Sequence, residues 1–408
     1  MKKISVIGLG YIGLPTALIF ASNGIQVVGT DISAELIDML KSGRPPFKEK
    51  GLDELFNKAV ENNIEFTSEY KRADMYIVAV PTPYVKRNKK LDPKYVIKAV
   101  ESVLNIIQNE GILVIESTIS PGTIDEFIRP LVNRLKHEKS INVNLVHAPE
   151  RILPGNMLYE LENNSRTIGA DSLEIANVVK EEYGKFCKSE IIITDIKTAE
   201  MTKVIENTYR DINIAFANEL AKICYQNDMN VYEIIRIANK HPRVNILQPG
   251  PGVGGHCISV DPWFLVGDYP DIVNVILAAR KVNDEMPSYV LKRISDIMSK
   301  HNIKDINRVG FYGLTYKENV DDTRESPTLQ ILEKLSENLV FGVKTFDPFI
   351  NQIIVEGQEL DFDNFLKNID ILVIMVAHNH IKENVDKIKE KIIFDTRNVI
   401  NIDDVYKL

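Results

Sequence analysis

The sequence predicts an α/β protein with two doubly wound domains, joined by a long helix and an all-helical middle domain. Three observations predict this class. Short β-branched runs alternate with amphipathic stretches through the first half of the chain, a long stretch without Gly or Pro follows, and a second alternating pattern fills the last quarter. Strands separated by helices form right-handed crossovers and a parallel sheet.

The first domain is expected to cover residues 1–195. Its buried strands are expected at KISVIG, QVVGTD, MYIVAV, ILVIEST, VNLVHAP and EIIITD, with helices over 93–109 and 123–136. The opening MKK and the apolar run after it also have the outline of a secretory signal peptide. A strand entering a helix explains the glycines at fixed offsets in this run, which a signal peptide does not, and we therefore favour the strand.

The middle domain is expected to cover residues 196–300 and the last domain 301–408. Residues 196–226 contain apolar side chains at spacings of three and four, which predicts one long helix, and more helix is expected over 231–239 and 271–299. This helical segment could support dimer contacts. In the last domain, strands are expected at RVGFYGLT, VKTFDP, IDILVIMVA and KIIFDT.

Composition and charge exclude several classes of protein. A net charge of −8 argues against a general nucleic-acid binder or a basic membrane-surface protein, and no run is long and apolar enough to span a bilayer. The three cysteines, Cys187, Cys224 and Cys257, are far apart, which favours neither a disulfide framework nor a zinc site. A soluble, cytoplasmic protein fits these features best. Cys187 and Cys224 fall in stretches that we expect to be helical and packed.

The segment GLGYIG predicts a dinucleotide-binding turn. It places Gly8, Gly10 and Gly13 directly after a strand and at the start of a helix, where such glycines permit a tight turn, a close pyrophosphate and close helix packing. The second strand ends in Asp31, where an acidic side chain holds the ribose hydroxyls and repels a 2′-phosphate. This combination predicts binding of NAD rather than NADP.

Polar residues follow three more strands of the first domain. Thr82, Thr118 and Glu150 lie in the segments VAVPTP, IESTISPGT and HAPERILPG. Because ligands of open α/β sheets bind beyond the carboxyl ends of the strands, these residues outline a cofactor and substrate crevice.

The predicted long helix and the glycine loop carry further polar residues. Lys203 and Asn207 lie four apart and share one face of the helix, next to a Glu206–Arg210 pair that we interpret as a solvated salt bridge. The segment PGPGVGGHCISVDPW surrounds Cys257 with small residues, so that a ligand can approach the backbone closely. This context indicates a nucleophilic cysteine.

Seven segments together resemble the UDP-glucose/GDP-mannose dehydrogenase family. In order they are GLGYIGLPTA, VPTP, ESTISPGT, HAPERILPG, EMTKVIENTYRDINIAFANE, PGPGVGGHCISVDPW and GLTYKENVDDTRESP, and they span nearly the whole chain. The resemblance implies two Rossmann-like domains, the first binding NAD and the last binding a UDP-sugar. The helical domain between them would carry the catalytic cysteine loop and the dimer contacts.

The resemblance implies a four-electron oxidation of a sugar C6 alcohol that uses two NAD⁺ in sequence. Cys257 would form a thiohemiacetal with the intermediate aldehyde and then a thioester. Lys203 would stabilise the developing oxyanion, Asn207 would hold the sugar oxygen, and Asp261 would activate or position water.

Two more residues would complete the acid/base and water network, Thr118 and Glu150. Pro154 stands where UDP-glucose dehydrogenases usually have a Glu, so we expect no acidic role at that position. His256 is expected to be structural, because other family members have Ser or Tyr there.

The resemblance also assigns binding residues. For NAD they are Gly8, Gly10, Tyr11, Ile12, Gly13, Asp31, Thr82, Thr118 and Arg324, and for the UDP-sugar they are Glu150, Arg151, Lys203, Asn207, Arg243, Gly254, Tyr316 and Lys317. Tyr316 and Lys317 suit contact with uracil or diphosphate, and Arg324 would reach the cofactor across the domain cleft. Arg243 would reach the sugar pocket of a neighbouring subunit, which implies a homodimer or higher oligomer.

Within the family, the segments HPRVNIL and GVGGHCISVDPWFLV are most similar to those of members that act on UDP-N-acetyl-D-mannosamine. The resemblance therefore implies this substrate, and a product that would enter polysaccharide biosynthesis. UDP-N-acetylglucosamine and UDP-glucose remain alternatives; enzymes acting on the former typically have Pro and Ile where this chain has Ser259 and Val260. A non-catalytic NAD-binding sensor is less favoured, because Cys257 and Lys203 are both present. A two-electron 3-hydroxyacid dehydrogenase is less favoured because it does not explain Cys257. No metal, nucleic acid or membrane is expected as a partner.

Overall fold

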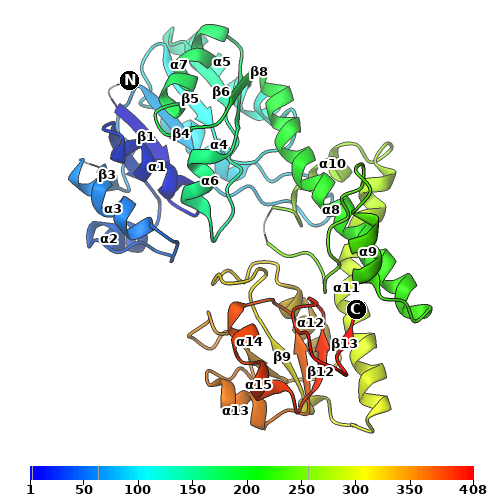
Figure 1. The fold of residues 1–408 in the computed structure, drawn as a ribbon. Coiled ribbons are helices and arrows are strands. Elements are labelled where there is room, and N and C mark those ends of the chain that lie inside the picture. The colour runs from blue at the N-terminus through cyan, green and yellow to red at the C-terminus, as the bar shows by residue number, and fades with distance from the viewer. Residues whose placement is uncertain (2, 63, 256) are drawn as a thin grey trace. The chain divides into compact units, whose positions relative to one another are not determined.

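The computed structural model describes residues 1–408 except 2, 63 and 256. The described chain divides into two units, Met1–Glu206 and Asn207–Leu408. Figure 1 shows both units, with their helices and strands labelled where there is room. The three-domain boundaries at residues 195 and 300 stay a prediction.

The described part of the first unit contains an eight-stranded sheet in the order β3-β2-β1-β4-β5-β6-β7-β8. Its strands are β1 (Lys3–Ile7), β2 (Gln26–Thr30), β3 (Ile64–Thr67), β4 (Met75–Val78), β5 (Gly111–Ile115), β6 (Val143–His147), β7 (Arg166–Ala170) and β8 (Ile191–Thr194). The strand order reverses between β1 and β4, which hydrogen-bond to each other in parallel. The carboxyl ends of strands diverge at such a switch point and leave a crevice for ligands.

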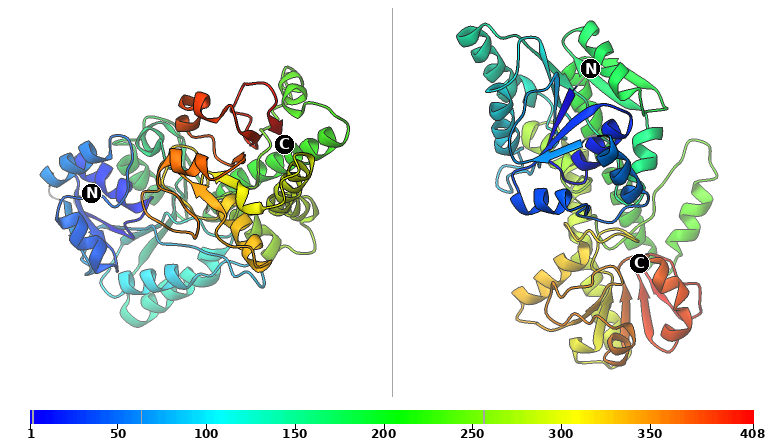
Figure 2. Two further views of the ribbon diagram at one scale, coloured as in Figure 1. Left: turned by 90° about the horizontal axis from the view of Figure 1, so that it is seen from below. Right: turned by 90° about the vertical axis from the view of Figure 1, so that its left-hand side faces the viewer.

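Helices cover both faces of this sheet, because right-handed crossovers on the two sides of the switch point put α1 and α4 on opposite faces (Figure 2). Buried side chains of β1 and of α1, α3 and α7 share one apolar core. The helical segments are α1 (Gly13–Ser22), α2 (Ala34–Lys41), α3 (Leu52–Glu61), α4 (Lys94–Leu104), the π-helical turn η1 (Ile124–Ile128), α5 (Arg129–Lys139), α6 (Met157–Asn163) and α7 (Leu173–Tyr183).

All six strands expected in the first domain are present, but β3 and β7 were not expected. The sheet is parallel, as predicted, except at one pair, since β7 runs antiparallel to β6. The chain leaves β6 at His147 and returns through the short helix α6, so this connection is no longer a βαβ crossover. The expected helix over 93–109 ends at Leu104, and the one over 123–136 begins as the π-helical turn η1.

The long helix predicted over 196–226 is confirmed as α8 (Ile196–Gln226), which crosses the division between the two units. The second unit continues with α9 (Val231–Ala238), α10 (Asp261–Asp268) and α11 (Asn274–Lys300). Asn230 caps α9, because its Oδ1 accepts hydrogen bonds from the backbone N–H groups of Tyr232 and Glu233. Helix α10 begins four residues after Cys257, and this places the cysteine in the loop that enters the helix.

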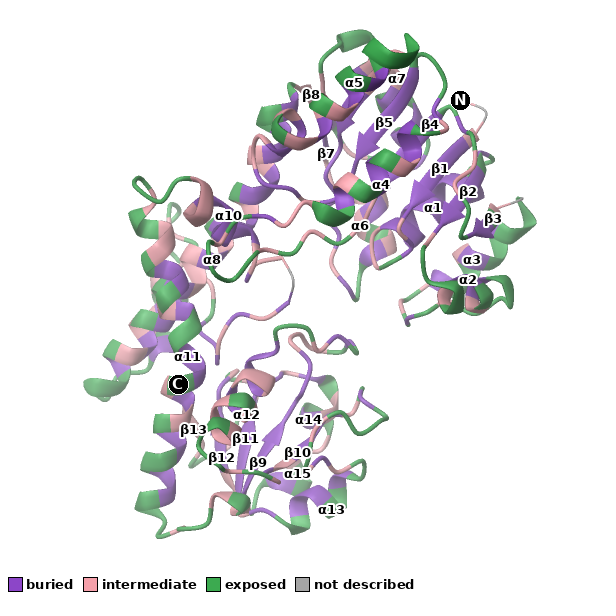
Figure 3. Ribbon diagram, turned by 180° about the vertical axis from the view of Figure 1, so that it is seen from behind, coloured by how far each residue is buried: buried purple, intermediate pink, exposed green. Residues whose placement is uncertain are grey.

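The second unit has a parallel sheet in the order β10-β9-β11-β12-β13, with buried strands that Figure 3 shows in purple. Its elements are η2 (Ile306–Arg308), β9 (Val309–Tyr312), α12 (Pro327–Glu337), β10 (Lys344–Phe346), α13 (Phe362–Lys367), β11 (Ile371–Ile374), α14 (Asn379–Glu383), α15 (Val385–Ile388), β12 (Ile392–Asp395) and β13 (Tyr406–Lys407).

The strands of the second sheet alternate between two apolar cores. Phe311 packs with residues of the long helices, and Tyr312 packs with residues of α13 on the other face. The switch point of this sheet lies between β9 and β11. The predicted fold class, two doubly wound α/β sheets with a helical region between them in the chain, is confirmed.

Candidate active site

The glycine turn after β1 has the geometry of a dinucleotide cradle. A Cβ on Gly8 would lie 2.4 Å from the carbonyl oxygen of Ala79, and one on Gly13 would lie 1.8 Å from the carbonyl oxygen of Gly8. A Cβ on Gly10 would meet no atom within 4 Å. Gly8 also has a positive φ of 89°, which favours glycine. These glycines let α1 begin directly against β1 and leave the backbone of Gly10 approachable, as a pyrophosphate requires.

Asp31 is held in place at the end of β2. Its carboxylate accepts hydrogen bonds from the backbone N–H groups of Leu9, at 2.8 Å, and Ser33, at 2.9 Å. The first of these bonds ties Asp31 to the glycine turn, so the sequence correctly predicted that the two lie together. The turn and the carboxylate beside it therefore fit NAD.

Tyr11 and Ile12 directly precede α1. The Tyr11 ring stacks on Phe47 with centroids 4.4 Å apart. Ile12 is the N-cap residue of α1 and provides no side-chain hydrogen bond to the helix. The first turn of α1 therefore has backbone N–H groups that no side chain of its N-cap satisfies, which suits an anionic ligand.

Thr82 and Thr118 are half-buried and follow β4 and β5, which are neighbours in the sheet. Ser117 joins the two loops, because its Oγ accepts a hydrogen bond from the N–H of Val80 at 2.8 Å. The loop after Thr118 is held by Glu200 of α8, whose carboxylate accepts from the N–H groups of Gly122 and Ile124. Sequence reasoning missed Ser117 and Glu200, although they lie in the segments ESTISPGT and EMTKVIENTYRDINIAFANE, because their roles depend on contacts with loops from elsewhere in the chain.

Glu150 belongs to a buried charge cluster that sequence reasoning also missed. Its carboxylate pairs with the guanidinium of Arg166 on β7, and this guanidinium lies 3.6 Å from Glu116 at the end of β5. Tyr183 donates a hydrogen bond to Glu116 at 3.0 Å. Burial raises the pKa of Glu116 to about 7, the charge of Arg166 opposes this, and the charge of Glu150 adds to it. The cluster holds Glu150 in one orientation at the carboxyl edge of the sheet.

Arg151 is anchored beside this cluster. It donates hydrogen bonds to Ser165 and to Thr167, the latter at 2.9 Å, and forms an ion pair with Glu206 of α8 at 2.8 Å. Our interpretation of Glu206 as the partner of Arg210 in a solvated pair is therefore wrong: Glu206 ties α8 to the loop after β6. Arg151 can contact a substrate only with the donors that these partners leave unused.

Lys203 and Asn207 lie on one face of α8, as their spacing predicted, and both are buried. Within the part of the chain that the structure describes, no hydrogen bond or ion pair involves the Lys203 ammonium. Asn207 donates a hydrogen bond from Nδ2 to Asp261 Oδ2 at 2.6 Å. The structure thus brings Asn207 and Asp261 together.

Cys257 is the least buried of the three cysteines, since Cys187 and Cys224 are buried. Its carbonyl oxygen accepts hydrogen bonds from the N–H groups of Val260, at 3.1 Å, and Asp261, at 2.9 Å. The thiol therefore lies in a tight turn directly before α10 and its first residue, Asp261. Our expectation of a helical position is wrong for Cys187, which follows the end of α7, and right for Cys224 in α8. His256 lies outside the described residues.

The glycines before Cys257 are needed for protein contacts. A Cβ on Gly254 would lie 2.7 Å from Cβ of Tyr316, and one on Gly255, whose φ is 80°, would lie 2.8 Å from the Tyr316 ring. The N–H of Gly255 also donates to the carbonyl oxygen of Arg324 at 3.0 Å. The loop that we assigned to sugar contact is therefore packed against the segment that carries Tyr316, Lys317 and Arg324.

The remaining predicted binding residues are Arg324, Arg243, Tyr316 and Lys317. The guanidinium of Arg324 donates to Asp322 Oδ1 at 2.9 Å. Arg243 is exposed in the loop after α9, and its backbone N–H donates to Nδ1 of His241 at 3.3 Å. Tyr316 and Lys317 are half-buried at the carboxyl end of β9. All four of these positions belong to the second unit.

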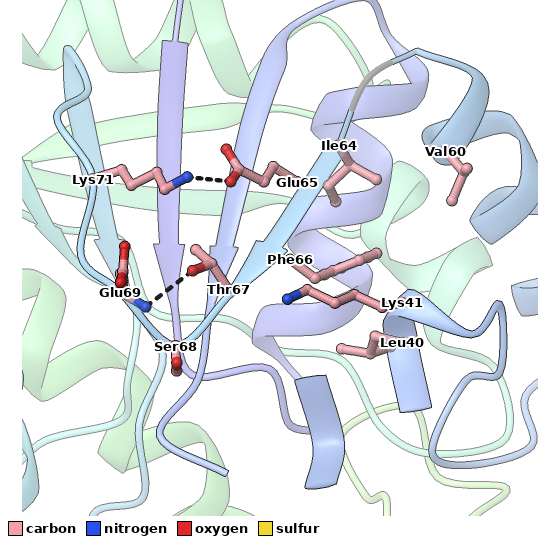
Figure 4. Close-up of a pocket in the computed structure, with 10 residues that line it drawn as sticks. All are labelled: Leu40, Lys41, Val60, Ile64, Glu65, Phe66, Thr67, Ser68, Glu69 and Lys71. Atoms are coloured by element: carbon pink, nitrogen blue, oxygen red, sulfur yellow. Dashed lines mark hydrogen bonds and ion pairs between the residues drawn. The ribbon is translucent and has the colours of Figure 1, made fainter. Parts of the chain in front are cut away.

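A pocket lies elsewhere, on the outer edge of the first sheet (Figure 4). It is lined by β3 and by the ends of α2 and α3, and its charged side chains include the Lys71–Glu65 ion pair. None of the predicted site residues lines it. Among the described residues, no group of three His, Cys, Asp or Glu side chains could hold a metal ion, and no helix is long and apolar enough to cross a membrane.

Comparison with known proteins gives three family matches along the chain. They are the NAD binding domain of the UDP-glucose/GDP-mannose dehydrogenase family over residues 2–187, its central domain over 197–285 and its UDP binding domain over 310–402. Together they cover most of the sequence.

Individual relatives match over nearly their whole length. A UDP-N-acetyl-D-mannosamine dehydrogenase of Methanocaldococcus jannaschii is 44% identical over 98% of this chain and 93% of its own. An NDP-N-acetyl-D-galactosaminuronic acid dehydrogenase of Ralstonia nicotianae is 39% identical over 97% and 96%. The solved structure of the UDP-N-acetyl-mannosamine dehydrogenase of Staphylococcus aureus is 40% identical, with a TM-score of 0.88 over 100% of this chain and 98% of that one. The chain therefore belongs to the UDP-glucose/GDP-mannose dehydrogenase family and is an NAD-dependent UDP-sugar dehydrogenase.

Proposed function

We propose that the protein oxidises the C6 hydroxyl of UDP-N-acetyl-D-mannosamine to the carboxylate, through a thioester on Cys257. Two observations support the substrate: the M. jannaschii and S. aureus relatives carry the name of this activity, and the matches extend over nearly the whole chain. One observation supports the mechanism above the others. Cys257 is the least buried cysteine and sits in a turn joined directly to the buried Asn207–Asp261 pair.

When bound, NAD⁺ supplies a hydride acceptor for each of the two oxidations. Gly8, Gly10 and Gly13 would hold its pyrophosphate and Asp31 its ribose, with Tyr11, Ile12, Thr82 and Thr118 beside the turn. Arg324 stays a predicted cofactor contact. We expect Asp31 to favour NAD⁺, because a 2′-phosphate would meet its negative charge.

Cys257 acts between the two oxidations. The first converts the alcohol to an aldehyde and releases one proton. The thiolate sulfur then forms a bond to the aldehyde carbon and gives a thiohemiacetal, whose loss of hydride leaves a thioester. Water attacks the thioester carbon, the C–S bond breaks, and the carboxylate and the free thiol result. Each sugar therefore reduces two cofactor molecules and consumes one water.

The polar residues divide the remaining tasks. The Lys203 ammonium would stabilise negative charge on the C6 oxygen in both tetrahedral intermediates. Asn207, fixed by Asp261, would orient that oxygen, and Asp261 would position the attacking water. Glu150 and Thr118 would complete the proton and water network, with Arg166 holding the Glu150 carboxylate.

The nucleotide half would lie on the second unit. Tyr316 and Lys317 follow β9 at the switch point of the second sheet, where ligands of such sheets bind. They fall within the match to the UDP binding domain. Lys317 offers a cation for the diphosphate and Tyr316 an aromatic face, while Arg151 and Gly254 would line the sugar. Arg243 would reach the sugar pocket of a second subunit.

A substrate panel tests the proposal. We expect the purified chain with NAD⁺ to form two NADH per UDP-N-acetyl-D-mannosamine, measured by absorbance. It should turn over UDP-N-acetylglucosamine, UDP-N-acetylgalactosamine and UDP-glucose at least about tenfold less efficiently, because a misplaced hydroxyl leaves polar groups unpaired. The galactosamine sugar is included because the R. nicotianae relative is named for that configuration. A preference for another sugar would refute the substrate, and NADH formation from none would favour the non-catalytic NAD-binding sensor.

A further inference from the structure

The segment from Leu314 to Asn319 carries Tyr316 and Lys317 and starts at the carboxyl end of β9. Two buried side chains from the neighbouring strands reach it. Asp347 directly follows β10, and His378 follows β11 by a few residues. Because β9 lies between β10 and β11 in the sheet, both side chains lie beside the start of this segment.

Asp347 fixes the first part of the segment. Its Oδ2 accepts hydrogen bonds from the N–H groups of Leu314, at 2.7 Å, and Thr315, at 3.1 Å, while Oδ1 accepts from Phe349 at 2.8 Å. Burial alone would raise the pKa of Asp347, but the hydrogen bond from His378 and these backbone N–H groups hold that pKa below its usual range. The side chain therefore acts as a charged acceptor buried beneath the segment.

His378 fixes the end of the segment, and its contacts define its tautomer. Nδ1 accepts a hydrogen bond from the N–H of Asn319 at 2.9 Å, so the ring proton must be on Nε2. Nε2 lies 3.2 Å from Asp347 Oδ2 and 3.3 Å from Thr315 Oγ1, and it can donate to either. The ring stacks on Phe349 with centroids 4.9 Å apart, which prevents it from turning.

Asn319 and Thr315 complete this arrangement. Asn319 has a φ of 59°, in the left-handed region that Asn adopts more readily than most residues with a side chain, and its Oδ1 accepts from the N–H of Asn379 at 3.0 Å. Thr315 Oγ1 donates to the carbonyl oxygen of Lys317 at 2.9 Å. The backbone is thus held on both sides of Tyr316 and Lys317.

Tyr316 also brings the restrained segment into contact with the loop before Cys257. Its side chain packs so closely on Gly254 and Gly255 that a Cβ on either glycine would clash with it. Gly255 lies two residues before Cys257. The position of the 314–319 segment therefore also determines where the loop before the nucleophile can lie.

We propose that His378 and Asp347 are positioning residues, which hold the 314–319 segment in the conformation that binds the UDP portion of the substrate. This inference rests on the proposed function, in which Tyr316 and Lys317 contact the nucleotide. Neither side chain touches the substrate. Their part is to fix the nucleotide-binding segment before the substrate arrives, so that binding does not have to order it.

Two conservative replacements of His378 separate its two nitrogen atoms. Asn places an acceptor near the position of Nδ1, and Gln places a donor near that of Nε2. We expect His378→Gln, which loses the acceptor for Asn319, to bind UDP about five- to tenfold more weakly by isothermal titration, the effect of one lost hydrogen bond to an ordered segment. His378→Asn should keep affinity within about twofold of the wild type for the same reason.

The full-length protein and a matched control give further readouts. The KM for the UDP-sugar should rise in His378→Gln while that for NAD⁺ stays unchanged. Amide hydrogen exchange should accelerate over 314–319 but not in β9. His380→Gln is the control, because His380 lies two residues away, also contacts the Tyr312 ring, and bonds to Tyr312 rather than to the 314–319 segment.

If His378→Gln fails to fold, Asp347→Asn provides the second test. It keeps the size of the side chain but removes the charge that accepts from the N–H groups of Leu314 and Thr315, so we expect faster exchange over 314–319 and weaker UDP binding. Wild-type UDP affinity in a folded His378→Gln or Asp347→Asn would overturn the inference while leaving the proposed function intact. Absence of UDP binding by the wild-type protein would overturn both.

Discussion

Cys257 differs from the other two cysteines in its surroundings, and at the residue scale this difference gives the first prediction. Hydride transfer from the alcohol needs no thiol, whereas the aldehyde must become a tetrahedral adduct before it can lose a second hydride. We expect Cys257→Ser to stop formation of the acid, because a hydroxyl is a far weaker nucleophile than a thiolate near neutral pH. Aldehyde or a stalled ester-linked enzyme should accumulate, detected by intact mass after rapid quench.

The buried cysteines are the matched controls. Cys224 is a buried residue of α8, and Cys187 follows α7 in the core of the first unit. Cys187→Ser and Cys224→Ser should therefore retain a yield of two NADH per sugar, although each loses some stability. The same yield from Cys257→Ser would rule out the thioester.

Asp31 carries the prediction on cofactor choice. Its carboxylate is fixed by the N–H groups of Leu9 and Ser33, so it cannot swing away from an incoming 2′-phosphate. We expect the catalytic efficiency with NAD⁺ to exceed that with NADP⁺ by about 100-fold or more. The reason is that placing the 2′-phosphate beside a carboxylate of the same charge costs several kcal/mol. Asp31→Asn should narrow this ratio by raising the efficiency with NADP⁺. Comparable efficiencies in the wild type would contradict the role of Asp31.

The site residues that the sequence predicts share one property: they lie in short segments whose spacing has a physical reason. Gly8, Gly13 and Asp31 are of this kind, and so is the i, i+4 pair of Lys203 and Asn207. Arg166 could not be found in this way. It opens an apolar strand, and its role depends on two carboxylates that lie about 16 and 50 residues earlier in the chain, a pairing that only the folded sheet creates.

At the scale of elements, the strands β5, β6 and β7 meet at a cluster with more acid than base. With Glu116 protonated, Arg166 and Glu150 form a balanced pair, and with Glu116 ionised the cluster gains an unpaired buried charge. The pKa of Glu116, raised to about 7 chiefly by burial, reflects this preference for the neutral form.

The sign of the pH effect follows from this shift. A carboxyl group whose pKa is higher in the folded state than its ordinary 4.5 stabilises the fold fully below that value, and this contribution is lost as the pH rises through about 7. We expect the melting temperature to fall between pH 5 and pH 8, and to fall less in Glu116→Gln. A difference of about 3 °C or more is expected, from 1.36 kcal/mol per pKa unit and about 2–4 °C per kcal/mol.

Two more buried carboxyl groups contribute in the same direction. Burial raises the pKa of Glu200 to about 7 and that of Asp211 to about 6. The control variant is Glu65→Gln, because Glu65 forms an exposed ion pair with Lys71. This variant should have the same pH dependence as the wild type. An identical pH dependence in Glu116→Gln and the wild type would show that Glu116 is ionised throughout.

The elements predicted correctly are those with a strong period or continuous apolar runs. Helix α8 was found because nothing interrupts its pattern over 196–226, and the central strands because they are buried on both faces. Strand β7 was missed because RTIGA contains a charged residue and a glycine, and its antiparallel pairing with β6 depends on the path of the chain through α6. Local propensity does not contain that path.

At the scale of the whole molecule, one face of α8 remains exposed in the single chain. Tyr209, Phe216 and Ile223 are 60%, 52% and 47% exposed, and their spacing of seven residues places them along one stripe. We expect this stripe to pack against a second copy of the chain. Phe216→Glu should shift the protein toward monomers in sedimentation velocity, whereas Lys300→Glu at the end of α11 should leave the oligomer intact.

Arg243 connects such an oligomer to activity, because its exposed guanidinium is expected to serve the sugar pocket of the other subunit. Arg243→Ala should stay oligomeric, keep its affinity for NAD⁺ and lose affinity for the UDP-sugar.

A mixture of Arg243→Ala with Cys257→Ser then distinguishes the two possible locations of the arginine. If Arg243 acts across the interface, a hybrid dimer pairs the intact Cys257 of one chain with the intact Arg243 of the other and rebuilds one native site. Random exchange of subunits in a symmetric dimer makes half of the dimers hybrid, so the mixture should recover about a quarter of wild-type activity at subsaturating substrate. If Arg243 served its own chain, every site would lack either the nucleophile or the arginine, and mixing would restore nothing.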